Sequence, residues 1–186
     1  MEINRFKEKY IALDLEMNQP SGTIIQIGGA FGSYKENEPI ETFSAIINPL
    51  EILEPRIIEL TGITQDNVDN GVTLIEGYNQ LLNFLKDKEL FINPITWGGG
   101  DSIELKEQLL KLNVLDVNNW KFGRRWIDTK TLYCGYRIAN GKEPAGGLAK
   151  AMTHMGLKFE GRKHNAMDDA KNTLIMFRKM IQFFKL

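Results

Sequence analysis

The sequence predicts an α/β fold in which a mixed sheet is flanked by helices on both faces. Three apolar runs with short polar connections lie between residues 10 and 47, and apolar residues then recur mainly at helical spacing. Short connections favour antiparallel strands, whereas strands that alternate with helices favour parallel pairing. We therefore expect three antiparallel N-terminal strands, parallel strands later in the chain, and a three-layer arrangement.

The three N-terminal strands are apolar runs bounded by turn residues. They are expected at residues 10–16, 23–31 and 41–47. Side chains on a strand alternate between its two faces, so Ile11, Leu13 and Leu15 of the first strand should all enter one core. The opposite face of this strand is left for its polar residues.

The helices are marked by apolar spacing and by capping residues. We expect them at residues 54–60, 73–85, 102–112, 127–139, 146–155 and 166–184. Thr73 with Glu76 forms a capping-box pattern, and Ser102 is the expected cap of its helix. Asn165 is the expected cap of the last helix, with Asp168 at the third position of a capping box.

A fourth strand is expected at residues 91–97, where an apolar run contains Pro94 and is followed by three glycines. Consecutive glycines allow a tight turn or the close approach of another chain. Asp101 comes next, at the exit of a strand and the start of a helix, which is a favourable place for a functional carboxylate. The alternative for Asp101 alone is an ordinary acidic residue at a helix start.

Length and composition are those of an ordinary soluble globular protein. The chain has 186 residues, 42% of them apolar and 25% charged, and we expect one domain over residues 1–186. The net charge of −1 excludes a polyanion-binding surface that covers the whole molecule. Cys134 is the one cysteine, so no internal disulfide can form. The charged N-terminus and the lack of a long apolar stretch predict a cytoplasmic protein without a membrane span.

Asp14 and Glu16 are the first candidate functional residues. They follow one another on the polar face of the first strand, next to a core. Two like charges in such a place cost free energy unless a cation neutralises them, and carboxylate oxygens suit Mg²⁺ or Mn²⁺. A solvated edge face is the alternative for this pair taken alone.

The second candidate group lies at the start of the last helix. His164 precedes this helix in a loop and Asp169 falls in its first turns, beside the apolar residues of the helix. Asp168 is explained by capping, whereas Asp169 has no such explanation and is the better ligand candidate. His154, the second histidine, lies in a predicted helix and is expected to be structural or exposed.

Taken in their order along the chain, these candidate residues resemble the motifs of the DEDDh 3′–5′ exonucleases of the DnaQ-like, ribonuclease H-fold superfamily. The matching residues are Asp14-Leu15-Glu16, Asp101, and His164 with Asp169 five positions later. Each motif alone is weak, but three in this order on strand and helix form a specific signal. Residues 60–69, 122–128 and 159–164 further resemble the group that contains the histone-mRNA 3′ exonuclease, RNA-interference exonucleases and KapD-like proteins.

The resemblance implies a ribonuclease H-like fold and hydrolysis of phosphodiester bonds from a 3′ end with two Mg²⁺ or Mn²⁺ ions. It implies metal binding by Asp14, Glu16, Asp101 and Asp169, with His164 as the general base that takes a proton from water. The expected substrates are single-stranded RNA or DNA 3′ ends, with RNA favoured, and the expected products are nucleoside 5′-monophosphates. The alternatives are a DNA-directed proofreading or repair exonuclease, and an inactive nucleic-acid-binding module on the same fold.

Contacts with the substrate are expected close to these motifs. The candidate residues are Met17, Asn18, Leu60, Thr61 and Trp97, with Arg162 and Lys163 as candidate phosphate contacts. Trp97 could stack on a base, or it could be a core residue at the end of a strand. Because the net charge gives no general attraction to a polyanion, a protein partner could be needed to recruit the substrate.

Overall fold

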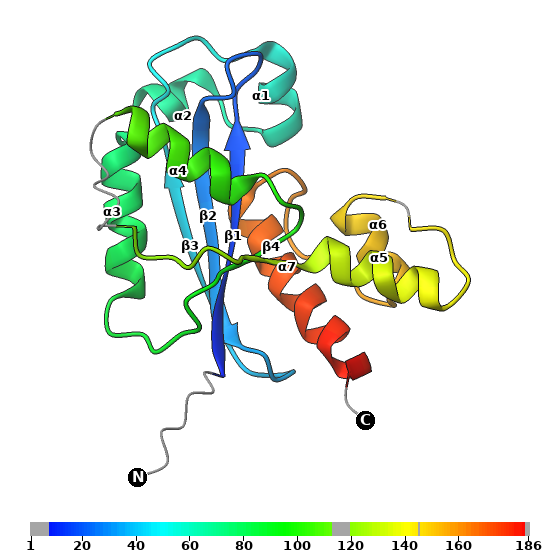
Figure 1. Cartoon of the computed structure of the whole chain (residues 1–186). Coiled ribbons are helices and arrows are strands. Elements are labelled where there is room, and N and C mark those ends of the chain that lie inside the picture. The colour runs from blue at the N-terminus through cyan, green and yellow to red at the C-terminus, as the bar shows by residue number, and fades with distance from the viewer. Residues whose placement is uncertain (1–7, 113–119, 145, 185–186) are drawn as a thin grey trace.

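The computed structural model describes residues 8–112, 120–144 and 146–184. Within these residues five strands form one sheet in the order β3-β2-β1-β4-β5 (Figure 1). The strands are β1 (Lys9–Met17), β2 (Ile24–Ser33), β3 (Ile40–Ile46), β4 (Ile95–Thr96) and β5 (Ile127–Asp128). The pairs β1–β2 and β2–β3 are antiparallel, and the pairs β1–β4 and β4–β5 are parallel. The predicted mixed sheet is therefore confirmed.

Helices cover both faces of this sheet. They are α1 (Pro55–Thr61), α2 (Gln65–Asp69), α3 (Leu74–Leu85), α4 (Asp101–Lys111), α5 (Thr129–Ala139), α6 (Leu148–His154) and α7 (Ala166–Ile181), with a 3₁₀ turn η2 (Gln182–Phe184). Helices α3 and α4 lie on one face and α7 on the other, with α5 and α6 packed beside α7 (Figure 1). No helix in the described ranges has the length and apolar character that crossing a membrane requires.

The alternation of β1 decides which of its residues face which layer. Ile11, Leu13 and Leu15 pack in the core between the sheet, α3 and α4, as predicted. Burial of such a side chain contributes about 1.5–3 kcal/mol. Ala12 points the other way and packs against Ala170 of α7. Asp14 and Glu16 follow Ala12 at steps of two, so the acidic pair faces α7.

Three predicted elements differ in detail from the structure. The strand expected at 91–97 is confined to β4, because Pro94 has no N–H to donate to a neighbouring strand. Helix α4 begins at Asp101 with Gly100 as its N-cap, so the expected cap at Ser102 is wrong. The helix expected at 127–139 starts two residues later, since the first two residues form β5 and Asp128 caps α5.

The cap of α7 is also only partly as predicted. The side chain of Asn165 accepts a hydrogen bond from the backbone N–H of Asp168, as expected. The capping box is wrong, because the Asp168 carboxylate instead accepts from the backbone N–H of Arg162 at 2.8 Å. Helix α2 was not expected, and it begins with a capping box formed by Thr64 and Asn67. Residues 1–7, which belong to the charged N-terminus on which the cytoplasmic prediction rests, lie outside the described residues.

Candidate active site

Four carboxylates and a histidine meet at the end of β1. Asp14 and Glu16 come from β1, Asp101 from the first turn of α4, and Asp169 from the first turn of α7. The charges of Asp101, Asp169 and Glu16 all act on Asp14, so the four groups form one cluster. Ligand atoms of Glu16, His164 and Asp169 lie within 4.8 Å of one another. The structure thus brings together the five residues that the sequence motifs single out.

Helix α7 reaches this cluster because β2 leaves room for it. Gly28 pairs with Asp14 across the antiparallel ladder. A Cβ atom at Gly28 would overlap the backbone of Ala166 and Met167, so only glycine allows the first turn of α7 to lie against β2 here. Gln26 fixes the same turn, because its side-chain oxygen accepts a hydrogen bond from the backbone N–H of Ala166 at 2.9 Å. Asp169 is thereby carried to the acidic pair of β1.

A fifth carboxylate, Asp128, supports the position of Asp101. Its Oδ1 atom caps α5 by accepting from the backbone of Lys130 and Thr131, and it also accepts from the backbone N–H of Gly98 at 3.0 Å. Gly98 begins the glycine turn that leads to Asp101. This role of Asp128 is not among the predictions, because Asp128 was expected inside the helix at 127–139; an acidic residue directly before a helix is a recognised N-cap signal.

His164 is held by the helix that it precedes. Its backbone N–H donates to Oδ2 of Asp169 at 3.1 Å, and its φ of 59° lies in the left-handed region. Histidine adopts this region more often than most residues, and such strained residues cluster at functional sites. The imidazole is exposed beside Glu16 and Asp169, where it can exchange protons with a bound molecule.

Burial raises the pKa of every carboxylate in the cluster. Desolvation, with the charges of Asp169 and Asp101, raises the pKa of Glu16 to about 8. Desolvation, with the charges of Asp128 and Glu104, raises the pKa of Asp101 to about 7. The pKa of Asp169 rises to about 6, mainly by desolvation, and that of Asp14 rises well above its ordinary range for the same reason.

This electrostatic state fits a site for divalent cations. The side chains of Asp14, Glu16, Asp101 and Asp169 offer only hard oxygen ligands, which Mg²⁺ and Mn²⁺ prefer. Their mutual repulsion is the free-energy cost that a bound cation removes. The donor set therefore fits the metal expected from the sequence, and no basic side chain is bonded to these carboxylates among the described salt bridges.

The raised pKa values predict that the metal-free protein loses stability as the pH rises. In the folded protein each of these carboxyl groups keeps its proton to a higher pH than in the unfolded chain, where it is released near pH 4. The contribution of each group to folding stability is therefore complete below about pH 4, and it is lost as the pH rises through the folded pKa. In chelator, the Tm should fall from about pH 6 to about pH 9 by roughly 2–8 °C, which corresponds to about 1–2 kcal/mol. Millimolar Mg²⁺ should restore most of the difference at the higher pH.

Thermal melts at the two pH values, with chelator or Mg²⁺, measure this effect. Glu16→Gln cannot ionise, so this variant should show a flatter pH dependence and a smaller gain from Mg²⁺. A Tm that increases with pH in chelator would contradict the assignment of these carboxylates to a desolvated cluster.

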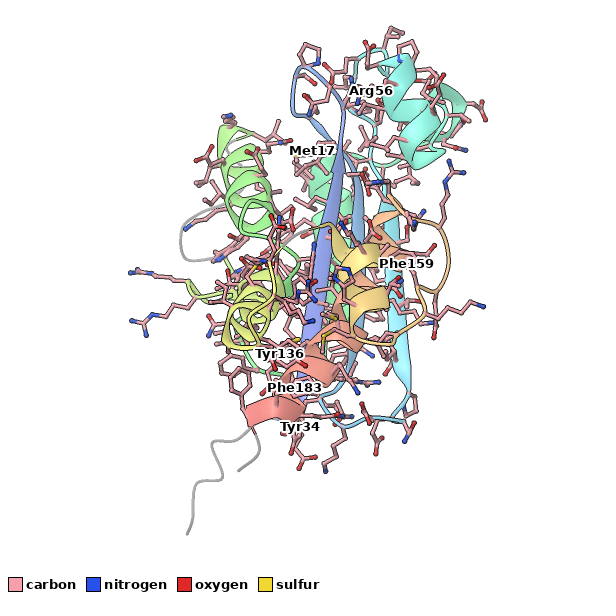
Figure 2. All side chains as sticks on the ribbon, turned by 90° about the vertical axis from the view of Figure 1, so that its right-hand side faces the viewer. Met17, Tyr34, Arg56, Tyr136, Phe159 and Phe183 are labelled. Atoms are coloured by element: carbon pink, nitrogen blue, oxygen red, sulfur yellow. The ribbon has the colours of Figure 1, made fainter. Side chains whose placement is uncertain are left out.

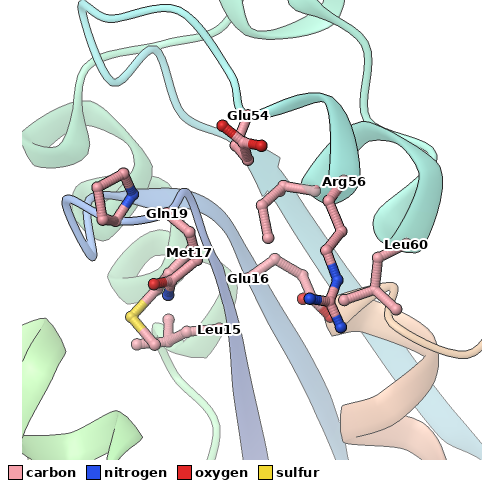
Figure 3. A pocket seen from close by; sticks show the side chains of 9 residues that line it. Leu15, Glu16, Met17, Gln19, Glu54, Arg56 and Leu60 are labelled. Atoms are coloured by element: carbon pink, nitrogen blue, oxygen red, sulfur yellow. The ribbon is translucent and has the colours of Figure 1, made fainter.

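An open cleft of about 640 Å³ adjoins the cluster, with Glu16 in its wall. Figure 2 shows Met17 and Arg56 at the end of the molecule where β1 finishes, away from Tyr136 and Phe183. Figure 3 shows Glu16 between Met17 on one side and Arg56 and Leu60 of α1 on the other. Two of the residues expected to contact substrate, Met17 and Leu60, therefore line a space next to the carboxylates.

Asn18 and Thr61, two other expected contacts, are buried and bonded within the protein. The Asn18 amide donates to Glu51 and accepts from the backbone N–H of Glu54. The Thr61 hydroxyl donates to the carbonyl of Ile57. Their side chains therefore hold the loop before α1 and the end of α1, and are not free for a ligand.

The remaining expected contacts lie in three different environments. Trp97 is half-buried and packs against Tyr133, with 5.9 Å between ring centroids. Lys163 is exposed beside His164. The guanidinium of Arg162 lies against α1, where it donates to the carbonyl of Glu59 at 3.3 Å. His154, predicted to be structural or exposed, is exposed and pairs with the buried Tyr133 hydroxyl at 2.6 Å.

The fold and this cluster define a class of protein: α/β proteins with a cluster of carboxylates, suited to divalent cations, at one end of a mixed sheet. Residues 11–177 match the exonuclease family known as RNase_T, and the chain belongs to this family. The resemblance to exonucleases that the sequence motifs indicate is thereby confirmed.

Curated relatives agree with this membership. The chain is 27% identical to mouse ERI1 exoribonuclease 2, over 96% of this chain and 30% of that protein. It is 27% identical to human 3′-5′ exoribonuclease 1, over 76% of this chain and 41% of that protein. The chain thus spans less than half the length of these relatives.

The fold is shared with solved nucleases. The nuclease domain of 3′hExo, described as a DEDDh family member bound to rAMP, has a TM-score of 0.80 and 21% identity, covering 96% of this chain and 94% of that chain. E. coli exonuclease I in complex with a dT13 oligonucleotide has a TM-score of 0.72 and 14% identity, covering 96% of this chain and 43% of that chain. These similarities confirm the ribonuclease H-like architecture.

Proposed function

We propose that this protein is a metal-dependent 3′–5′ exonuclease that removes nucleoside 5′-monophosphates from single-stranded ends, with RNA preferred over DNA. The observation that carries the proposal is the cluster of four desolvated carboxylates and a histidine beside an open cleft. The preference for RNA rests on the exoribonuclease relatives, whose printed names describe that activity.

In the proposed reaction, Asp14, Glu16, Asp101 and Asp169 hold two divalent cations. Such cations, when bound, stabilise the charge that develops at the phosphate and favour ionisation of water. His164 accepts the proton of the attacking water through an imidazole nitrogen. The new bond joins the water oxygen to phosphorus, and the bond between phosphorus and the 3′ oxygen breaks. That oxygen leaves as a hydroxyl after taking a proton from solvent.

The cleft is the proposed binding site of the 3′-terminal nucleotide. Met17 and Leu60 offer apolar surface on opposite sides of the space next to Glu16. A nucleotide base held between them would place its phosphate at the carboxylates, and the rest of the chain would extend away from the site. Because the net charge is −1, long-range attraction for the substrate is weak, and recruitment by a protein partner is part of the proposal.

Matched 5′-labelled RNA and DNA oligonucleotides of the same sequence test this function. In Mg²⁺ or Mn²⁺ we expect a ladder that shortens from the 3′ end, faster for RNA, and no products in excess chelator. Faster shortening of DNA would favour a DNA-directed enzyme, and products that persist in chelator would exclude the metal-dependent reaction. Binding without cleavage would support a nucleic-acid-binding module instead.

A further inference from the structure

The loop between α6 and α7 is tied to α7 by its backbone. Glu160 exchanges two hydrogen bonds with the side chain of Asn172, at 2.9 and 2.7 Å. The N–H groups of Arg162 and His164 donate to the carboxylates of Asp168 and Asp169. These bonds fix the loop to its own helix, but they do not fix it to the cleft.

The side chain of Arg162 makes the connection to the cleft. Its guanidinium donates to the carbonyl of Glu59 in the last turn of α1. Among the described residues, this is the hydrogen bond that joins the His164 loop to α1. The same helix supplies Arg56 and Leu60 to the wall of the cleft.

Gly62 provides the space that this contact needs. A Cβ atom at Gly62 would overlap the Arg162 guanidinium, and the φ of 75° at Gly62 is itself unfavourable for other residues. Gly62 also ends α1, with its N–H bonded to the carbonyl of Ile58 at 2.8 Å. The guanidinium therefore occupies the space next to the end of α1 that the missing side chain of Gly62 leaves open.

We propose that Arg162 is a positioning residue, which ties the loop carrying His164 to α1 so that the histidine and the wall of the cleft keep one fixed arrangement. The inference rests on the proposed role of His164 and of the cleft. It assigns to Arg162 a function different from the phosphate contact suggested by its position next to His164. A phosphate contact needs only a positive charge near the substrate, whereas this contact needs a donor group that lies over Gly62 and reaches the carbonyl of Glu59.

The test compares Arg162→Lys with Arg162→Ala in the RNA-shortening assay. If Arg162 positions His164, both variants should lose about 10- to 100-fold in kcat, since small displacements of catalytic groups have effects of this size. Lysine keeps the charge but should not restore the rate. Lys158→Ala is the matched control, because it removes one exposed cation from the same loop and should leave kcat unchanged.

An NMR measurement separates this inference from the proposed function. The chain has two histidines, so the ring signals of His164 can be assigned by their absence in a His164→Ala variant. Both Arg162 variants should shift or broaden the His164 signals in the metal-free protein. The His154 signals should not change, because that ring is held by Tyr133 on a different helix pair.

Two results would overturn the inference. One is unchanged His164 signals together with wild-type kcat in Arg162→Lys. The other is an Arg162→Ala variant that shows only an increased KM and a weaker salt dependence of KM, together with an Arg162→Lys variant that has the wild-type KM. This is the behaviour expected of a phosphate contact. If the wild-type protein fails to shorten RNA, the proposed function fails, and the NMR comparison still decides whether Arg162 positions the loop.

Discussion

Replacement of Asp14 by alanine is expected to abolish detectable nuclease activity. Asp14 is the carboxylate on which the other three charges of the cluster act, so its loss should remove one of the proposed cation ligands from the centre of the site. Bound cations contribute several kcal/mol to such reactions, and each 1.36 kcal/mol is a factor of ten in rate. We therefore expect a decrease of at least about 10³-fold in the rate of RNA shortening, measured with 5′-labelled substrate in Mg²⁺.

The same substitution should raise the stability of the metal-free protein. It removes a desolvated group that repels its neighbours, so the Tm in chelator at about pH 8 should increase while activity disappears. Asp14→Asn should behave similarly, because it keeps the shape and removes the charge. Glu107→Ala, which removes an exposed carboxylate on α4, is the control for both measurements. Normal digestion by Asp14→Ala would exclude the metal-site assignment.

Replacement of His164 by alanine is expected to lower kcat by about 10²–10⁴-fold, the usual contribution of a general base. The carboxylates remain in this variant, so the affinity for Mg²⁺ should change little. Titration of Mn²⁺ or Mg²⁺ by calorimetry, alongside single-turnover kinetics on RNA, measures the two quantities separately.

A variant of the second histidine serves as the control for this experiment. His154→Gln keeps a hydrogen-bond partner for the Tyr133 hydroxyl and should retain the wild-type rate. If His164→Ala instead retains its rate and loses metal affinity, His164 is a ligand and not a base. The structure allows this outcome, because Glu16, His164 and Asp169 lie close enough to bind one cation together.

Local sequence patterns predicted the strands and the main helices, and the resemblance to the DEDDh exonucleases joined the five residues of the cluster into one expected site. Asp14 and Glu16 could be placed on the face opposite Leu13 because the period of a strand is two, and this face does lie against α7. The order of the motifs, which resembles that of the exonuclease family, predicted that β1, α4 and α7 meet at one site. The sequence of any one of these segments does not show this.

The supporting contacts could not be predicted in this way, because each depends on packing between distant segments. Gly28 is one of several glycines in β2, and nothing local shows that α7 lies against it. Arg162 sits next to His164 in sequence, which suggested a phosphate contact, whereas its guanidinium lies at the end of α1. Asp128 was placed inside a predicted helix, so its bond to Gly98 was hidden.

The seating of α7 on β2 has a consequence for synthesis of the chain. Gln26 and Ala166, which fix this contact, are 140 positions apart in sequence. Contacts of such separation form only after a large loop has closed, which costs entropy and slows folding. Until α7 has been made and has docked on β2, Asp169 does not lie beside Asp14 and Glu16 of β1. During synthesis of the chain, the acidic cluster is therefore completed only after the segment that carries Asp169 has been made and has docked against β2.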